Sequence, residues 1–170
     1  MMMGHSHTHL EVSSMWKAMP SLILTVLLVS LVPGVVTGAA AQKVALTIRD
    51  FSYTPDKVTL QAGVPVEITI VNKGKVKHEF MLHTKPKVGM SGMRFHEWAE
   101  DNSYFKGVQV VAEGSGIEVE RKGMNVVEVQ IGAGKTAIVK FTPTKKGTFE
   151  YACLITGHYE QGQKGTLTVE

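Results

Sequence analysis

The chain holds a single cysteine, Cys153, in a segment that also carries other side chains of metal-binding type. Four residues separate Cys153 from His158, and four more separate His158 from Gln163. This short, even spacing lets a thiolate, an imidazole and a third donor point from one loop at one small cation. Soft sulfur and borderline nitrogen suit copper or zinc, and not calcium or magnesium. One loop offers too few strong ligands for a closed site, so a further histidine is expected from elsewhere in the chain.

The bulk composition is that of one globular domain with a hydrophobic core, since 44% of the 170 residues are hydrophobic and 19% are charged. The net charge of +3 comes without a basic stripe interleaved with aromatic residues, so nucleic acid is not an expected partner. A lone cysteine cannot form an intrachain disulfide. No paired carboxylates or catalytic triad are apparent, so we expect a protein that is not an enzyme.

Residues 1–41 are predicted to be an N-terminal extension followed by an export signal. Lys17 supplies a positive charge, residues 22–32 form an apolar run, and small residues at 39–41 offer a cleavage site. The histidines at positions 5, 7 and 9 are expected to have no function. The mature protein is therefore expected in the periplasm or outside the cell. Two outcomes stay open for the signal: cleavage before position 42, or retention as a membrane anchor, which would be the only contact with a membrane.

Residues 42–170 are predicted to form one all-β domain. Apolar residues alternate with polar ones in several short segments, such as 44–48, 66–70, 127–131 and 137–141. Turn signals rich in Gly, Pro, Asn and Lys separate these segments. Six or seven short strands of this kind predict an antiparallel β-sandwich of Greek-key type. The interval 84–115 breaks the rhythm, and we expect an irregular insertion with one short helix there.

Four histidines follow the signal region, at positions 78, 83, 96 and 158. His78 lies directly after the turn signal Asn72-Lys73-Gly74 and begins an apolar run. At this point the sequence resembles the cupredoxins, the single-domain blue copper proteins. The resemblance covers the whole of 42–170, and its motifs are residues 51–55, 62–68, 78–80, 147–153 and 162–169. The ligand spacing is similar to that of auracyanins, rusticyanin and stellacyanins.

The resemblance implies one type 1 copper ion per domain, held by His78, Cys153 and His158. The methionine usual at the axial position is replaced by Gln163, as in stellacyanin. A glutamine oxygen is a harder donor than a thioether, so it is expected to favour Cu(II) and to lower the reduction potential. The implied function is one-electron transfer between redox proteins. A second departure is Glu79, where relatives often carry an asparagine that ties the two ligand loops together, so this tie is in question.

A copper-binding carrier that does not exchange electrons is the alternative function. It would use an additional site built from His83, Met90, Met93 and His96. An electron carrier also needs partners, and a cluster of lysines just before His78 would steer partners with an acidic surface. These lysines lie at positions 73, 75 and 77.

Overall fold

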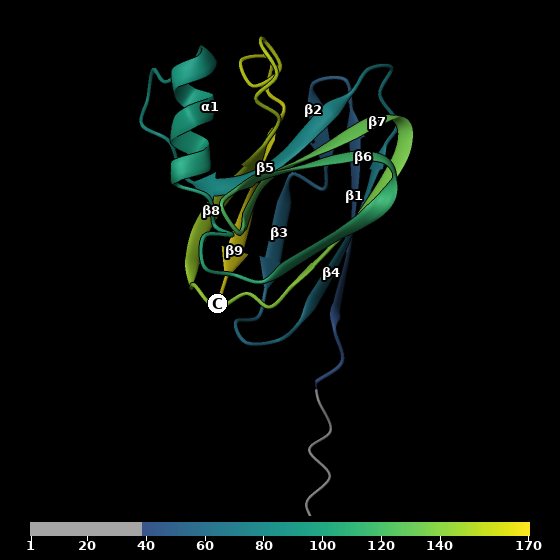
Figure 1. Ribbon diagram of the computed structural model, residues 1–170, viewed down its shortest axis with the longest axis vertical. Helices are drawn as coiled ribbons and strands as arrows, with labels where there is room; N and C mark the ends of the chain where they lie inside the picture. Colours follow the sequence, from purple (N-terminus) through teal and green to yellow (C-terminus); the bar gives the residue numbers. More distant parts are fainter. Residues whose placement is uncertain (1–38) are drawn as a thin grey trace, which may run out of the picture. The chain divides into compact units, whose positions relative to one another are not determined.

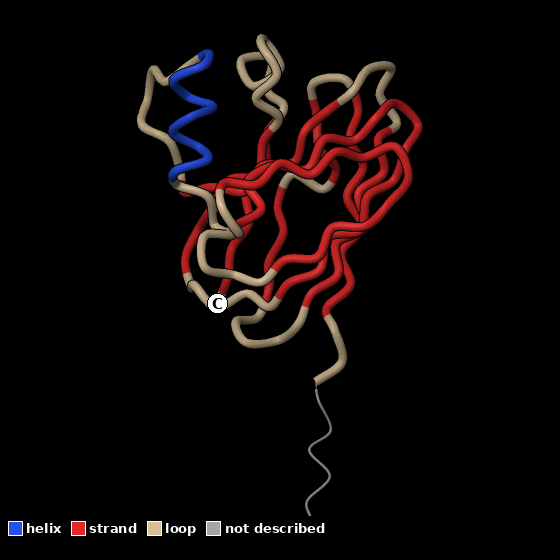
Figure 2. The backbone as a smooth tube through the Cα atoms, viewed as in Figure 1, coloured by secondary structure: helices blue, strands red, loops and turns tan. Residues whose placement is uncertain are grey.

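The structure is a computed structural model that describes residues 39–170, and the predicted export signal lies outside this range, apart from its cleavage site. The described residues form nine strands and one helix (Figures 1 and 2). This helix is too short to cross a membrane. The elements are β1 (Gln42–Arg49), β2 (Ser52–Thr54), β3 (Lys57–Leu60), β4 (Val66–Asn72), β5 (His78–Thr84), α1 (Gly92–Asp101), β6 (Val110–Lys122), β7 (Asn125–Phe141), β8 (Gly147–Ala152) and β9 (Lys164–Val169).

The strands form the predicted β-sandwich, with two sheets that share β5. The strand order is β2-β1-β4-β7-β5-β8-β9-β3, and β6 pairs with β7 alongside this path. The first residues of β5 pair with β7, whereas its last four pair with β8. Most pairs are antiparallel as predicted, but β1 runs parallel to β4 and β3 runs parallel to β9. Alternation of residue types identifies strands and does not specify their direction, so these two pairs could not be foreseen.

The core lies between the sheets and is built from the inward residues of the alternating segments. In β4 every second residue is buried, with Ile68 and Ile70 fully so. Aromatic side chains fill the space near β8, where Tyr151 packs edge-on against Tyr53 and its hydroxyl donates a hydrogen bond to the Pro55 carbonyl. Tyr151 lies two residues before Cys153, so the packed core reaches directly to the base of the predicted metal loop.

The interval 84–115 contains α1, in agreement with the expectation of a short helix in this region. Its C-terminal part was expected to be irregular, but from Val110 onward it is the long strand β6. Glycines at 114 and 116, with a break in register between Ser115 and Ile117, hide the strand pattern in the sequence. Helix α1 packs on β5 and β7, and Phe95 and Ala99 form its buried side. In Figure 1 it stands beside the loop that follows β8.

Candidate metal centre

The four residues expected to bind copper come from three places in the chain and meet at one end of the sandwich. His78 begins β5, Cys153 follows β8, and His158 and Gln163 lie in the loop that leads into β9. The ligand atoms of His78, Cys153 and His158 all lie within 4.8 Å of one another. His158 Nδ1 is 3.3 Å from Cys153 Sγ, and His78 Nδ1 is 4.0 Å from it. Gln163 Nε2 is 2.8 Å from His78 Nδ1.

The loop from β8 to β9 is closed by its own backbone hydrogen bonds. The Cys153 amide donates to the Gln163 carbonyl at 3.1 Å, and the Gln163 amide donates to the His158 carbonyl at 3.1 Å. Gly157 turns the chain with a φ of 83°, a conformation that side-chain-bearing residues rarely adopt. These bonds fix the positions of Cys153, His158 and Gln163 relative to one another.

Asn72 stabilises the turn that leads into His78. Its side-chain amide donates to the carbonyls of Val76 and Ile131, at 2.9 and 2.8 Å. Its side-chain oxygen accepts the Gly74 amide at 2.8 Å. The Asn72 side chain is fully buried, so its bond to Ile131 is shielded from water, and the bonds to Val76 and Gly74 are partly shielded. The sequence identified this residue only as part of a turn.

Asp50 orients the imidazole of His78, and sequence reasoning missed it. His78 Nε2 lies 3.2 Å from Asp50 Oδ1, which leaves Nδ1 free to face the cluster. The Lys75 amide also donates to Asp50, and this bond, with that of His78, lowers the pKa of the carboxyl. A side chain at Gly74 would collide with both Asp50 and His78, so glycine is required there. Asp50 is 28 residues from His78 in the chain, and no local pattern links the two.

The protonation state of the cluster determines which proton a bound cation would have to displace. Burial raises the pKa of the Cys153 thiol to about 12, although the Glu79 amide donates to its sulfur at 3.3 Å. Burial also keeps the pKa of His158 below its ordinary value, so this ring is neutral at pH 7. A metal ion would have to displace only the thiol proton to gain the thiolate and the imidazole.

Gln163 shows that the cluster fits a metal ion. Its side chain is fully buried, and its Oε1 has no hydrogen-bond partner among the described residues. A buried polar atom without a partner costs about 1–3 kcal/mol. Rotation of the amide about its last torsion would bring this oxygen to the side where the other donors converge, because the two amide positions are exchangeable. Two imidazoles, one thiolate and a weak oxygen donor are a copper-type ligand set.

Glu79 makes the tie between the ligand loops that the sequence left in question. Its carboxylate accepts the amide of Leu154, the residue after Cys153, at 3.1 Å. Its backbone carbonyl accepts the hydroxyl of Tyr53. A carboxylate therefore joins the His78 strand to the Cys153 loop, at the position noted above as a departure from the asparagine common in related proteins.

The additional Met and His site expected in residues 83–96 is not assembled. His83 is buried between Phe95 and Trp98, and its Nδ1 lies 2.8 Å from the Thr84 carbonyl. Met93 is exposed. His96 turns to the buried carboxylate of Glu128, which raises the pKa of the imidazole to about 9.

The lysines before His78 are on the surface, and one of them is engaged by the protein itself. Lys77 donates to the side chain of Gln130, and Glu118 lies 4.0 Å away.

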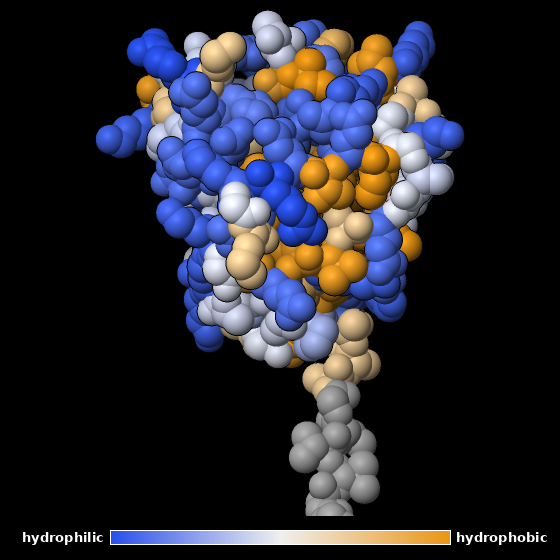
Figure 3. Space-filling model, viewed as in Figure 1, coloured by the Kyte–Doolittle hydropathy of each residue, from blue (hydrophilic) through white to orange (hydrophobic). Residues whose placement is uncertain are grey.

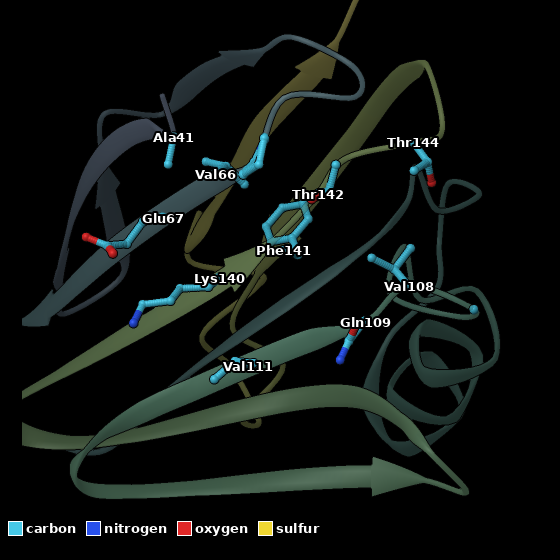
Figure 4. A pocket seen from close by; sticks show the side chains of 12 residues that line it. Ala41, Val66, Glu67, Val108, Gln109, Val111, Lys140, Phe141, Thr142 and Thr144 are labelled. Atoms are coloured by element: carbon cyan, nitrogen blue, oxygen red, sulfur yellow. The ribbon is translucent and has the colours of Figure 1, made fainter. Parts of the chain in front are cut away.

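Figure 3 shows one face of the molecule, where hydrophilic side chains surround smaller apolar patches. A groove of about 570 Å³ lies over β4, β6 and β7 (Figure 4), and its lining includes Val66, Val108 and Phe141 but none of the four expected ligands.

Comparisons with known proteins identify the family of this chain. The profile of the cupredoxin-like domain matches residues 20–94. The copper-resistant cuproprotein CopI of Pseudomonas aeruginosa is 30% identical over 142 residues, which cover 77% of each chain. This chain belongs to the cupredoxin family. The CopI protein of Rubrivivax gelatinosus is 28% identical over 117 residues, which are 69% of this cupredoxin but only 59% of the relative.

Solved structures confirm the cupredoxin fold. Reduced auracyanin from Roseiflexus castenholzii superimposes with a TM-score of 0.53 at 17% identity, over 78% of this chain and 99% of the other. Auracyanin B gives a TM-score of 0.53 at 22% identity, over 78% and 91%. A multicopper oxidase also matches, with a TM-score of 0.51 at 12% identity over 78% of this chain and 45% of its own. Auracyanins and a multicopper oxidase thus share this fold, and the function has to be argued from the site.

Proposed function

We propose that this cupredoxin is an exported electron carrier that holds one copper ion with His78, Cys153, His158 and, as the axial donor, Gln163. The His–Cys–His group, in which His78 and Cys153 are buried, is the observation that carries the proposal, together with the unpaired Gln163 oxygen beside it. Bound copper would supply a one-electron couple between Cu(I) and Cu(II). A β-sandwich that fixes the donors from three strand ends suits this task, because little has to move when the charge changes.

Neighbouring residues orient the proposed copper ligands, and one ligand, His158, reaches the surface. Asp50 fixes the ring of His78, and the Glu79 amide donates to the sulfur of Cys153. His158 is only half-buried, and Phe51 packs edge-on against its ring at 5.4 Å. The edge of His158 is therefore where a redox partner would approach the site. Four protein donors leave no open position for a substrate, which supports a carrier that is not an enzyme.

Location and partners follow from the sequence pattern. The apolar run before residue 33 supports export to the periplasm or beyond, with a membrane anchor only if this segment is retained. The partners would be redox proteins, and the exposed Lys73 and Lys75 near His78 would favour those with acidic surfaces. Salt should then slow electron exchange with such a partner.

A second candidate function is copper handling without electron exchange. It is favoured by the printed names of the two relatives, both copper-resistant cuproproteins. Both functions need the same copper ligands, so they differ in redox behaviour and in the number of ions bound.

Titration of the full-length protein with copper tests the proposal. With Cu(II), an electron carrier should show an intense visible thiolate-to-copper band, saturating at one equivalent, and reversible one-electron voltammetry. Cys153→Ser should abolish the band, and His83→Leu, a histidine outside the site, should keep it. A colourless protein that binds several Cu(I) ions and gives no reversible wave would refute electron transfer and favour copper handling.

A further inference from the structure

A second group of metal-binding side chains lies where α1 meets the sheet. Glu79 of β5, His96 of α1 and Glu128 of β7 place ligand atoms within 4.8 Å of one another. His96 Nε2 is 2.9 Å from Glu128 Oε2. On the other side of the ring, His96 Nδ1 is 3.2 Å from Glu100 Oε1. None of these side chains belongs to the copper ligand set.

The two carboxylates that the sheet contributes to this group are buried, and one of their oxygens lacks a hydrogen-bond partner among the described residues. Glu128 is 1% exposed and Glu79 is 6% exposed, so both are shielded from water. Glu128 Oε1 has no hydrogen-bond partner among residues 39–170. Burial of a carboxylate is costly unless it is paired and its oxygens are hydrogen-bonded. One imidazole reaches only one of the two oxygens of Glu128, and the second oxygen remains available to a cation.

We propose that Glu79, His96 and Glu128 form a second metal site, for a borderline divalent cation such as Zn(II) or Cu(II). One imidazole and two carboxylates suit these ions, whereas calcium needs six to eight oxygen ligands. Glu100 supports the assignment, because a histidine ligand normally donates its other ring nitrogen to a carboxylate. The cation would take a place between His96 Nε2 and the carboxylates, and Glu100 would hold the ring in that orientation.

This site differs from the one expected from sequence, and only His96 is common to both. His83 contacts the Thr84 carbonyl and Met93 is exposed, while His96 lies beside carboxyl groups of two strands, β5 and β7. Glu79 also accepts the Leu154 amide beside Cys153, so the second site adjoins the copper loop. It does not depend on copper being bound there.

Zinc titration in a suitable background tests the second site. The full-length chain would carry alanine at the three N-terminal histidines, His5, His7 and His9, to remove binding there. It would also carry Cys153→Ser, so that the result does not depend on the proposed copper function. Zn(II) is added against a chromophoric competing chelator, and the number and affinity of bound ions are fitted.

Glu128→Gln in this background should remove one zinc equivalent or weaken its binding at least tenfold. The matched control is Glu97→Gln, which makes the same charge change at an exposed position of α1 and should bind as the background does. His96→Gln, at a partly exposed position, gives a second variant in case Glu128→Gln fails to fold by circular dichroism. Equal zinc binding by Glu97→Gln and the folded site variants would overturn the proposal.

A zinc-soaked crystal gives an independent measurement. We expect an anomalous peak about 2.0–2.2 Å from an oxygen of Glu128 and from His96 Nε2. Absence of a peak, with His96 and Glu128 still in direct contact, would show an ion pair in place of a metal site.

Discussion

Replacement of Asn72 by alanine should loosen the turn that presents His78 and should cost the protein much of its stability. The side chain makes three buried or partly buried hydrogen bonds, two to carbonyls and one from the Gly74 amide. A hydrogen bond contributes about 1 kcal/mol net, so their loss lowers the free energy of unfolding by about 3 kcal/mol. Domains of this kind are stable by only about 5–15 kcal/mol.

Urea unfolding of the metal-free protein at pH 7 measures this loss. The matched control is Asn125→Ala, which removes an asparagine that also bridges a turn. Asn125 accepts the Gly107 amide at 2.8 Å, but at an exposed site where water can replace it. Its loss should cost less than about 1 kcal/mol. An unchanged denaturant slope would show that both variants retain a native-like unfolding transition.

The same variants report on the site. Because the Asn72 turn leads directly into His78, the visible spectrum of the copper-loaded Asn72→Ala protein should differ from that of the parent. The spectrum of Asn125→Ala should match the parent. If Asn72→Ala loses no more stability than Asn125→Ala, the turn is held by other contacts and the reasoning fails.

Three further predictions concern single side chains. Gly165→Ala should cost about 1–3 kcal/mol in urea unfolding, because its Cβ would overlap the ring of Tyr151; a neutral result would mean that the ring moves freely. Burial keeps the pKa of His83 below 6.5, so the unfolded chain binds the proton first as the pH falls. Stability should therefore drop below pH 6.5, and His83→Leu should flatten this drop in unfolding measurements between pH 5 and 8. Gln163→Met should raise the reduction potential, because a thioether favours Cu(I); an unchanged potential would remove Gln163 from the ligand set.

The donors of the predicted copper site could be read from the sequence because three of them lie in one loop. The spacing from Cys153 to Gln163 places them together whatever the rest of the chain does, and the family resemblance supplied His78. Asp50 could not be found in this way, because it meets His78 through a turn whose path depends on the pairing of β1 with β4.

Glu128 shows a different limit of sequence reasoning. The alternation of Val127, Val129 and Ile131 predicts that Glu128 faces water. In the structure four consecutive residues of β7, from Val126 to Val129, are buried, because α1 covers the second face of this strand. Period-two reasoning assumes that one face of the sheet is solvated, and it fails where a helix lies on that face.

The uneven burial of the four proposed ligands also bears on how a metal ion would leave. His78, Cys153 and Gln163 are fully buried, and among the four only His158 reaches the surface. An incoming chelator therefore meets His158 first, and the other donors become accessible only when residues 154–162 open. Local opening of a surface loop needs far less free energy than global unfolding. We expect the rate of metal exchange to follow the opening of this loop and to be insensitive to substitutions that weaken the distant sheet.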